Sequence, residues 1–68
     1  MSNEYKDWYE DRAYDVIIEN NLIRRIEYST KWYDGFLFIG YAPDWNEKVA
    51  YFVWLDDIDG WSYRQICI

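Results

Sequence analysis

The chain has 68 residues, a formal net charge of −6 at pH 7, one cysteine and no histidine. This length supports a single domain, so residues 1–68 are expected to form one compact unit. The composition excludes an internal disulfide, and it leaves neither a ligand set for structural zinc nor a common general base. We therefore expect no cofactor, no metal and no enzymatic activity.

The charge also limits the partners that the chain can bind. Neutralising phosphates requires clustered Lys and Arg, so direct binding to nucleic acid or to an anionic membrane is not expected. The complementary partner is a basic protein, including one that itself binds nucleic acid. No apolar stretch reaches the length of a membrane span, and the first residues lack a signal-peptide pattern. Together with the unpaired Cys67, this predicts a cytoplasmic protein.

Residues 3–20 have the pattern of an amphipathic helix. Apolar side chains recur at the three- to four-residue spacing of a buried stripe. They are Tyr5, Tyr9, Ala13, Val16 and Ile17. The Asn20–Asn21 pair marks the expected end. A helix that continues through Ile26 is the alternative, because Ile18, Leu22 and Ile26 keep a four-residue spacing.

From Ile26 onward the apolar spacing changes to two residues, which predicts β-strands. The dipeptide Asp34–Gly35 is a strong two-residue hairpin signal. Such a turn would place six side chains on one face, in the pairs Trp32–Leu37, Thr30–Ile39 and Tyr28–Tyr41. Residues 42–46 read as a loop. Further strands are expected at 48–55 and 61–68, joined by a turn at Asp56–Gly60.

The expected fold is α+β, with one N-terminal amphipathic helix packed on a four-stranded antiparallel β-meander. A single helix covers only one face of such a sheet. Both phases of the strands nevertheless carry large apolar residues, such as Phe52 and Trp54 on one phase and Tyr51 and Val53 on the other. Some aromatic surface should therefore stay exposed, and exposed patches of this kind mark contact surfaces.

The predicted helix also carries a row of acids, which are Glu4, Asp7, Asp11, Asp15 and Glu19. Like charges four residues apart repel, so the row costs about 1 kcal/mol of stability. This cost makes the row the leading candidate for a functional surface. The alternative is a solvated helix face that Arg12, Arg24 or Arg25 partly neutralises in the folded chain.

The spacing of the acids favours a partner that binds phosphates. Steps of four residues rise about 6 Å along a helix, on the order of the phosphate spacing along one nucleic-acid strand. A row of carboxylates at this spacing could occupy a groove built for a phosphate backbone. Asp56 and Asp57 in the predicted turn could extend the acidic surface, and an exposed Trp54 could supply an apolar anchor.

Other patterns have simpler explanations. Residues Asp57–Gly60 contain part of a calcium-loop pattern, but Ile66 stands where the bidentate Glu is required, so a hairpin turn is the better interpretation. Tryptophans and tyrosines could stack on sugars, although core packing is their more frequent use. The only basic cluster in the sequence consists of Arg24, Arg25 and Lys31. These cations are expected to pair with Glu27 or with the helix acids.

In general character (small, acidic and aromatic-rich) the chain resembles the short inhibitors that phages and mobile elements encode against host nucleic-acid enzymes, including DNA mimics and anti-CRISPR proteins. The likeness is one of composition and rests on no diagnostic motif. It implies a small non-catalytic inhibitor that docks on a basic, nucleic-acid-binding protein. Two other classes stay open: a structural or assembly subunit, such as a homodimer joined through an exposed aromatic sheet face, and a sugar- or peptide-binding module.

Overall fold

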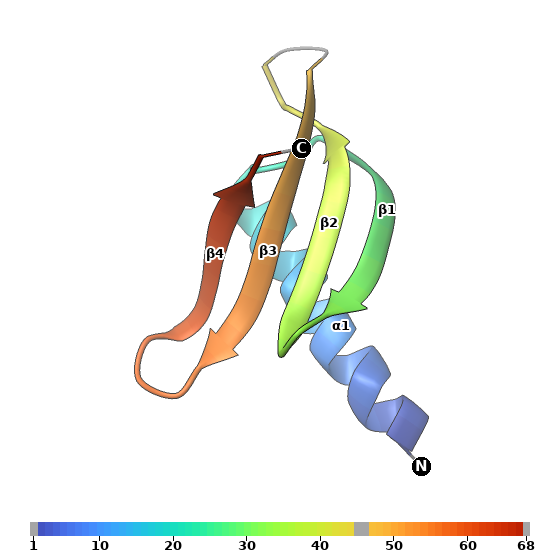
Figure 1. Cartoon of the computed structure of the whole chain (residues 1–68), viewed down its shortest axis with the longest axis vertical. Coiled ribbons are helices and arrows are strands. Elements are labelled where there is room, and N and C mark those ends of the chain that lie inside the picture. The colour runs from blue at the N-terminus through green and yellow to red at the C-terminus, as the bar shows by residue number, and fades with distance from the viewer. Residues whose placement is uncertain (1, 45–46, 68) are drawn as a thin grey trace.

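The computed structural model describes residues 2–44 and 47–67, with side chains from Tyr9 onward. Its elements are α1 (Ser2–Glu19), β1 (Arg25–Trp32), β2 (Gly35–Tyr41), β3 (Lys48–Asp56) and β4 (Gly60–Ile66). The strands form one antiparallel sheet in the order β1-β2-β3-β4. Figure 1 shows α1 behind one face of this sheet, with the other face turned toward the viewer. The predicted α+β meander with one helix is confirmed.

The helix ends because an asparagine adopts the left-handed conformation. Asn21 has a φ of 55°. Its N–H donates to the carbonyl of Ile18 at 3.1 Å, and the Leu22 N–H donates to the carbonyl of Ile17 at 3.0 Å. This pair of bonds is the Schellman motif, with Asn at the position that Gly usually takes. The alternative of a helix continuing through Ile26 is therefore wrong, and Ile26 lies in β1.

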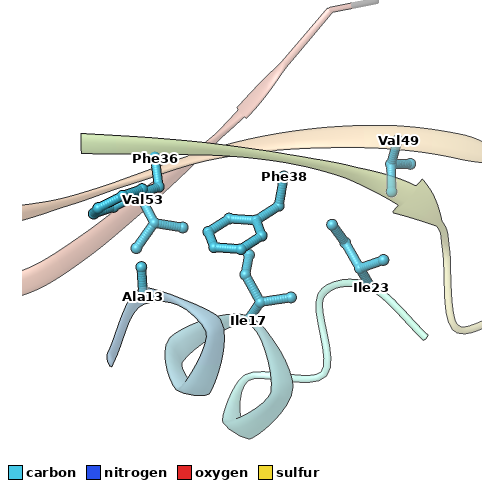
Figure 2. Close-up of a cluster of buried hydrophobic side chains, with 7 residues drawn as sticks. All are labelled: Ala13, Ile17, Ile23, Phe36, Phe38, Val49 and Val53. Atoms are coloured by element: carbon cyan, nitrogen blue, oxygen red, sulfur yellow. The ribbon is translucent and has the colours of Figure 1, made fainter. Parts of the chain in front are cut away.

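The core lies between α1 and the sheet, and Figure 2 shows its members. They are Ala13, Ile17, Ile23, Phe36, Phe38, Val49 and Val53. Ala13 and Ile17 point from the helix toward side chains that come down from β2 and β3. Burying each of the larger side chains contributes about 1.5–3 kcal/mol. The predicted buried face of the helix is confirmed from Tyr9 onward, while the side chain of Tyr5 lies outside the described residues.

The turn of the first hairpin lies one residue before the Asp34–Gly35 dipeptide that predicts it. Trp32 pairs directly with Gly35, so the turn consists of Tyr33 and Asp34, and Tyr33 has a φ of 53°. The predicted Asp34–Gly35 turn is therefore wrong by one residue and the predicted pairing by two; Leu37 pairs with Thr30 instead of Trp32. A shift of two residues leaves every side chain on its original face, so the predicted faces survive the error.

Gly35 explains the shift, because it is required inside the sheet. A Cβ at this position would lie 2.8 Å from Cε1 of Phe52 and 2.9 Å from Cβ of Trp54. The same Cβ would come closer still to the backbone carbonyl oxygen of Val53, which cannot rotate away as a ring can. All three contacts are closer than van der Waals packing allows, so only glycine fits against this part of β3. The packing of the sheet thus outweighs the local preference of Asp-Gly for a turn.

A bulge at Glu27 changes the alternation along β1. Ile26 pairs with Gly40 and Tyr28 pairs with Ile39, so Glu27 is the extra residue. The bulge turns Ile26 toward the helix side, where it packs against the core. Strict alternation would have placed Ile26 on the same face as Tyr28.

Candidate interaction surfaces

The predicted row of acids occupies the outer side of α1. Asp11, Asp15 and Glu19 are exposed, while Ala13 and Ile17 on the opposite side of the helix are fully buried. Two apolar side chains next to the acids, Tyr14 and Ile18, are each 46% exposed. We define the α1 outer surface as Asp11, Tyr14, Asp15, Ile18 and Glu19. The side chains of Glu4 and Asp7, on the same helix, lie outside the described residues.

The acids stand at the unfavourable end of the helix. Glu19 is the last residue of α1, Asp15 lies one turn before it, and the last turn contains no basic residue. The C-terminus of a helix carries a partial negative charge, which disfavours a nearby carboxylate by about 0.3–1 kcal/mol. Repulsion along the row and the helix dipole therefore act against the same side chains.

Of the cations that were expected to neutralise this row, Arg25 pairs with another acid and Arg12 lies beside the row. Among the residues that the structure describes, one ion pair forms, between Arg25 and Glu27 on β1 at 3.1 Å. The predicted pairing of the basic cluster with Glu27 is thus confirmed for Arg25. This ion pair involves none of the α1 acids. Arg12 lies close to two of them, since it borders the same hollow as Asp15 and Glu19.

That hollow lies between α1 and β4 and has a volume of about 310 Å³. Its lining consists of Arg12, Asp15, Val16, Glu19 and Trp61. The Trp61 ring also packs against Tyr9, with centroids 6.3 Å apart. Carboxylates beside an indole ring suit a Lys or Arg side chain, whose stem packs on the ring while its charge meets the acids. Trp61 was missed by sequence reasoning, because only the packing of β4 against the helix brings it to the acids.

The carboxylate of Asp56 accepts hydrogen bonds from the backbone of its own turn. One of its oxygens accepts hydrogen bonds from the N–H groups of Ile58 at 2.8 Å and Asp59 at 3.2 Å. These two bonds, from Ile58 first and then Asp59, lower the pKa of Asp56 below its ordinary value of 3.8. Asp56 pairs with Gly60, which confirms the predicted turn, and Asp57 is exposed within it. Among the side chains of residues 9–44 and 47–67, no three His, Cys, Asp or Glu gather to hold a metal ion.

Trp54 lies on the face of the sheet that is turned away from α1. Its ring stacks on Phe52, with centroids 5.3 Å apart and planes 17° apart. Phe52 in turn meets Trp32 edge-on at 5.2 Å and 87°. This aromatic cluster covers the space above Gly35. The structure therefore places Trp54 on the opposite side of the molecule from the α1 acids.

We call this second face the open face; it is the one turned toward the viewer in Figure 1. At one end of it, Tyr41 pairs with both Arg25 and Lys48, and each cation lies 5.9 Å from the centroid of its ring. A third cation, Arg64, pairs with Phe52 further along the sheet. Between them runs an apolar row of Tyr28, Ile39, Ala50 and Ile66.

The exposed aromatic surface that the sequence predicts is present on the open face, where Tyr28 is 55% exposed and Trp32 is 36% exposed. Its positive charge was not foreseen. Lys48 and Arg64 are isolated in the sequence, and strand pairing brings them to one face with Arg25. An acidic chain thus carries a cationic, aromatic face behind its acidic helix.

Comparison of the chain with protein-family models, with curated proteins and with solved structures finds no match. In the described part of the chain, no helix is both long enough and apolar enough to cross a membrane. Function is therefore argued from the two opposite surfaces themselves: an acidic helix with exposed Tyr14 and Ile18, and a sheet face that combines aromatic rings with cations.

Proposed function

We propose that the protein is a small non-catalytic inhibitor that docks on a basic, nucleic-acid-binding protein through the α1 outer surface. One observation carries the proposal: Asp11, Asp15 and Glu19 are exposed in a single row and take part in no ion pair between described side chains. Their spacing of about 6 Å along the helix approximates that of a phosphate strand. A groove that binds nucleic acid offers cations at a similar spacing.

The surface around the acids supports the same mode of binding. The carboxylates would steer a cationic partner and raise the rate of encounter. Tyr14 and Ile18 supply apolar area that a docked partner can cover. A Lys or Arg side chain of that partner would enter the hollow beside Trp61, where Asp15 and Glu19 outnumber Arg12 in the lining.

The general character of the chain indicates which targets to examine first. Because it resembles phage-encoded inhibitors of host nucleic-acid enzymes, bacterial defence nucleases, including CRISPR effectors, are the first class of candidates. Such a target would place the working protein in the host cytoplasm. Bound there, the helix would exclude the nucleic acid by occupying its site, and no chemical step would be needed.

The test compares two variants with equal net charge. The helix variant is D11N/D15N/E19Q, and the matched control, D34N/D44N/E47Q, removes three exposed acids outside α1. Each is used as bait in a nuclease-treated bacterial lysate at low salt. A basic protein retained by the wild type and the control, and identified by mass spectrometry, is then purified and its affinity measured against salt concentration.

We expect the helix variant to bind that protein about tenfold more weakly, with a flatter salt dependence, while the control binds like the wild type. Nucleic acid should compete with the wild type for the target. Equal losses for both variants would show that only bulk charge matters. Undiminished binding by a folded helix variant would place the interface elsewhere, and either result overturns the proposal.

A further inference from the structure

We propose that the open face binds the α1 outer surface of a second copy of this chain, so that copies associate head to tail. The inference does not depend on the proposed function, because it concerns the pure protein without a foreign partner. It starts from the position of the two surfaces on opposite sides of one sheet (Figure 1).

The two surfaces carry opposite charge. The α1 outer surface has three carboxylates, and the open face has Arg25, Lys48 and Arg64. On the open face, Glu27 pairs with Arg25, which leaves the positive charge to Lys48 and Arg64. Asp56 stays negative on the same face, but it lies at the far end of β3 from Lys48, in the turn that joins β3 to β4. Positive charge collected on one face of a chain with net charge −6 does not follow from composition.

The spacing of the charges also matches. Asp11 and Glu19 are eight residues apart on α1, which is about 12 Å along the helix axis. Lys48 and Phe52, the partner of Arg64, are four residues apart on β3, which is about 13 Å along the strand. A helix that lies along the strands therefore brings one acid near Lys48 while the other lies near Arg64.

Apolar side chains stand between the charges on both surfaces. Tyr14 and Ile18 flank the acids on the helix, and the row that contains Tyr28 and Ile39 lies between the cations on the sheet. Contact would remove apolar area from water on both sides. Arg12 borders the hollow beside β4 together with Asp15 and Glu19, so the contact has to accommodate one cation next to these acids. The sheet would then have a helix on each face.

The charges select this arrangement over a homodimer that joins two open faces. A sheet-to-sheet dimer would bring the cations of both copies together, and repulsion would oppose it. In the head-to-tail arrangement each copy uses its helix for one neighbour and its sheet for the other. Such a contact does not close by itself, so species larger than dimers form as the concentration rises.

The test is sedimentation equilibrium of the pure full-length chain from about 0.01 to 1 mM, a range suited to weak contacts. Three variants accompany the wild type. They are the helix variant D11N/D15N/E19Q, the sheet variant K48Q/R64Q, and the charge-matched control D34N/D44N/E47Q. Circular dichroism checks that each variant is folded.

We expect the mass of the wild type to rise beyond that of a dimer with concentration, and high salt to reverse the rise. The helix and sheet variants alone should associate at least about tenfold more weakly, and the control should associate at least as well as the wild type. An equimolar mixture of the helix and sheet variants should stop at a dimer, because one intact helix meets one intact sheet face.

Three outcomes would overturn the proposal. A wild type that stays monomeric throughout the range would show that copies of the chain do not bind each other, so that any partner of the open face is a different molecule. A helix variant that still dimerises would indicate the sheet-to-sheet homodimer. A mixture of the two variants that associates no better than either alone would show that the helix and the open face do not bind each other.

Discussion

The ring of Phe52 occupies the space that a side chain at Gly35 would need. A Cβ at Gly35 would lie 2.8 Å from Cε1 of Phe52, which itself contacts Trp32 and Trp54 on the same face. One glycine therefore fixes the register of the first hairpin and also allows the aromatic cluster of the open face to form. The two sides of the sheet are built differently: a helix covers one, and the other is partly sealed by its own aromatic rings.

The variant G35A should destabilise the fold. The new methyl group would force Phe52 and Trp54 out of their positions and press against the backbone of Val53, and overpacking of this kind costs about 1–3 kcal/mol. Urea denaturation monitored by tryptophan fluorescence measures the loss. An unchanged midpoint would mean that the cluster yields without cost and that Gly35 does not set the register.

The stability of variants at Asn21 should follow how well the new residue tolerates the left-handed conformation. The φ of 55° predicts that N21A loses about 1 kcal/mol, while N21G is at least as stable as the wild type. Thermal and urea unfolding of the three proteins give the order. If alanine proves as stable as glycine, the Schellman ending of α1 does not contribute as the geometry indicates.

The stability of the β3–β4 turn should depend on pH through Asp56. Its pKa is lowered in the folded chain by the N–H groups of Ile58 and then Asp59. A lowered carboxyl pKa adds stability above the unfolded value of 3.8, and this stability is lost as pH falls through the folded value. The wild type should therefore melt at a higher temperature than D56N near neutral pH, and the difference should disappear as the pH falls below the folded pKa of Asp56.

Melting curves of the wild type, D56N and the control D57N from about pH 7 to pH 2 check this prediction. Asp57 carries the same charge in the same turn, but no backbone N–H is bonded to it in the structure. A difference between the wild type and D56N that is the same at every pH would refute the role of the Asp56 carboxylate.

Truncation of the core should cost most of the available stability. Phe38 is 1% exposed and belongs to the same buried cluster as Ile17 and Val53, and F38A should lose about 3–5 kcal/mol. The total for a domain of this size is about 3–10 kcal/mol, so this variant should be largely unfolded. The control I58A removes an apolar side chain that is 91% exposed and should stay within about 0.5 kcal/mol of the wild type.

Circular dichroism and urea unfolding compare the two truncated variants. A cooperative transition for F38A at the wild-type midpoint would show that Phe38 is not central to the core, while a large loss for I58A would show that the β3–β4 turn has packing that its exposure does not reveal.

The sequence alone predicts much of this architecture because the relevant signals are local. Three- to four-residue spacing around Ala13 and Ile17 identifies the helix and its buried face, and two-residue spacing identifies the strands. Exposure of Asp11 follows from the same geometry, since the side of the helix opposite the core must face water. These features depend on residues close together in the chain.

The tertiary structure decided what depends on residues far apart. Asp34–Gly35 is a turn signal by itself, but close packing against the Val53 backbone and the Phe52 ring of β3 makes Gly35 a strand residue. Trp61 reaches the α1 acids only because β4 packs beside the helix. Lys48 and Arg64 share a face only because strand pairing places them there. Local spacing sets the conformation of each segment and the outer surface of α1. Pairing and packing between segments set which side chains meet, and the open face and the hollow beside Trp61 depend on these contacts.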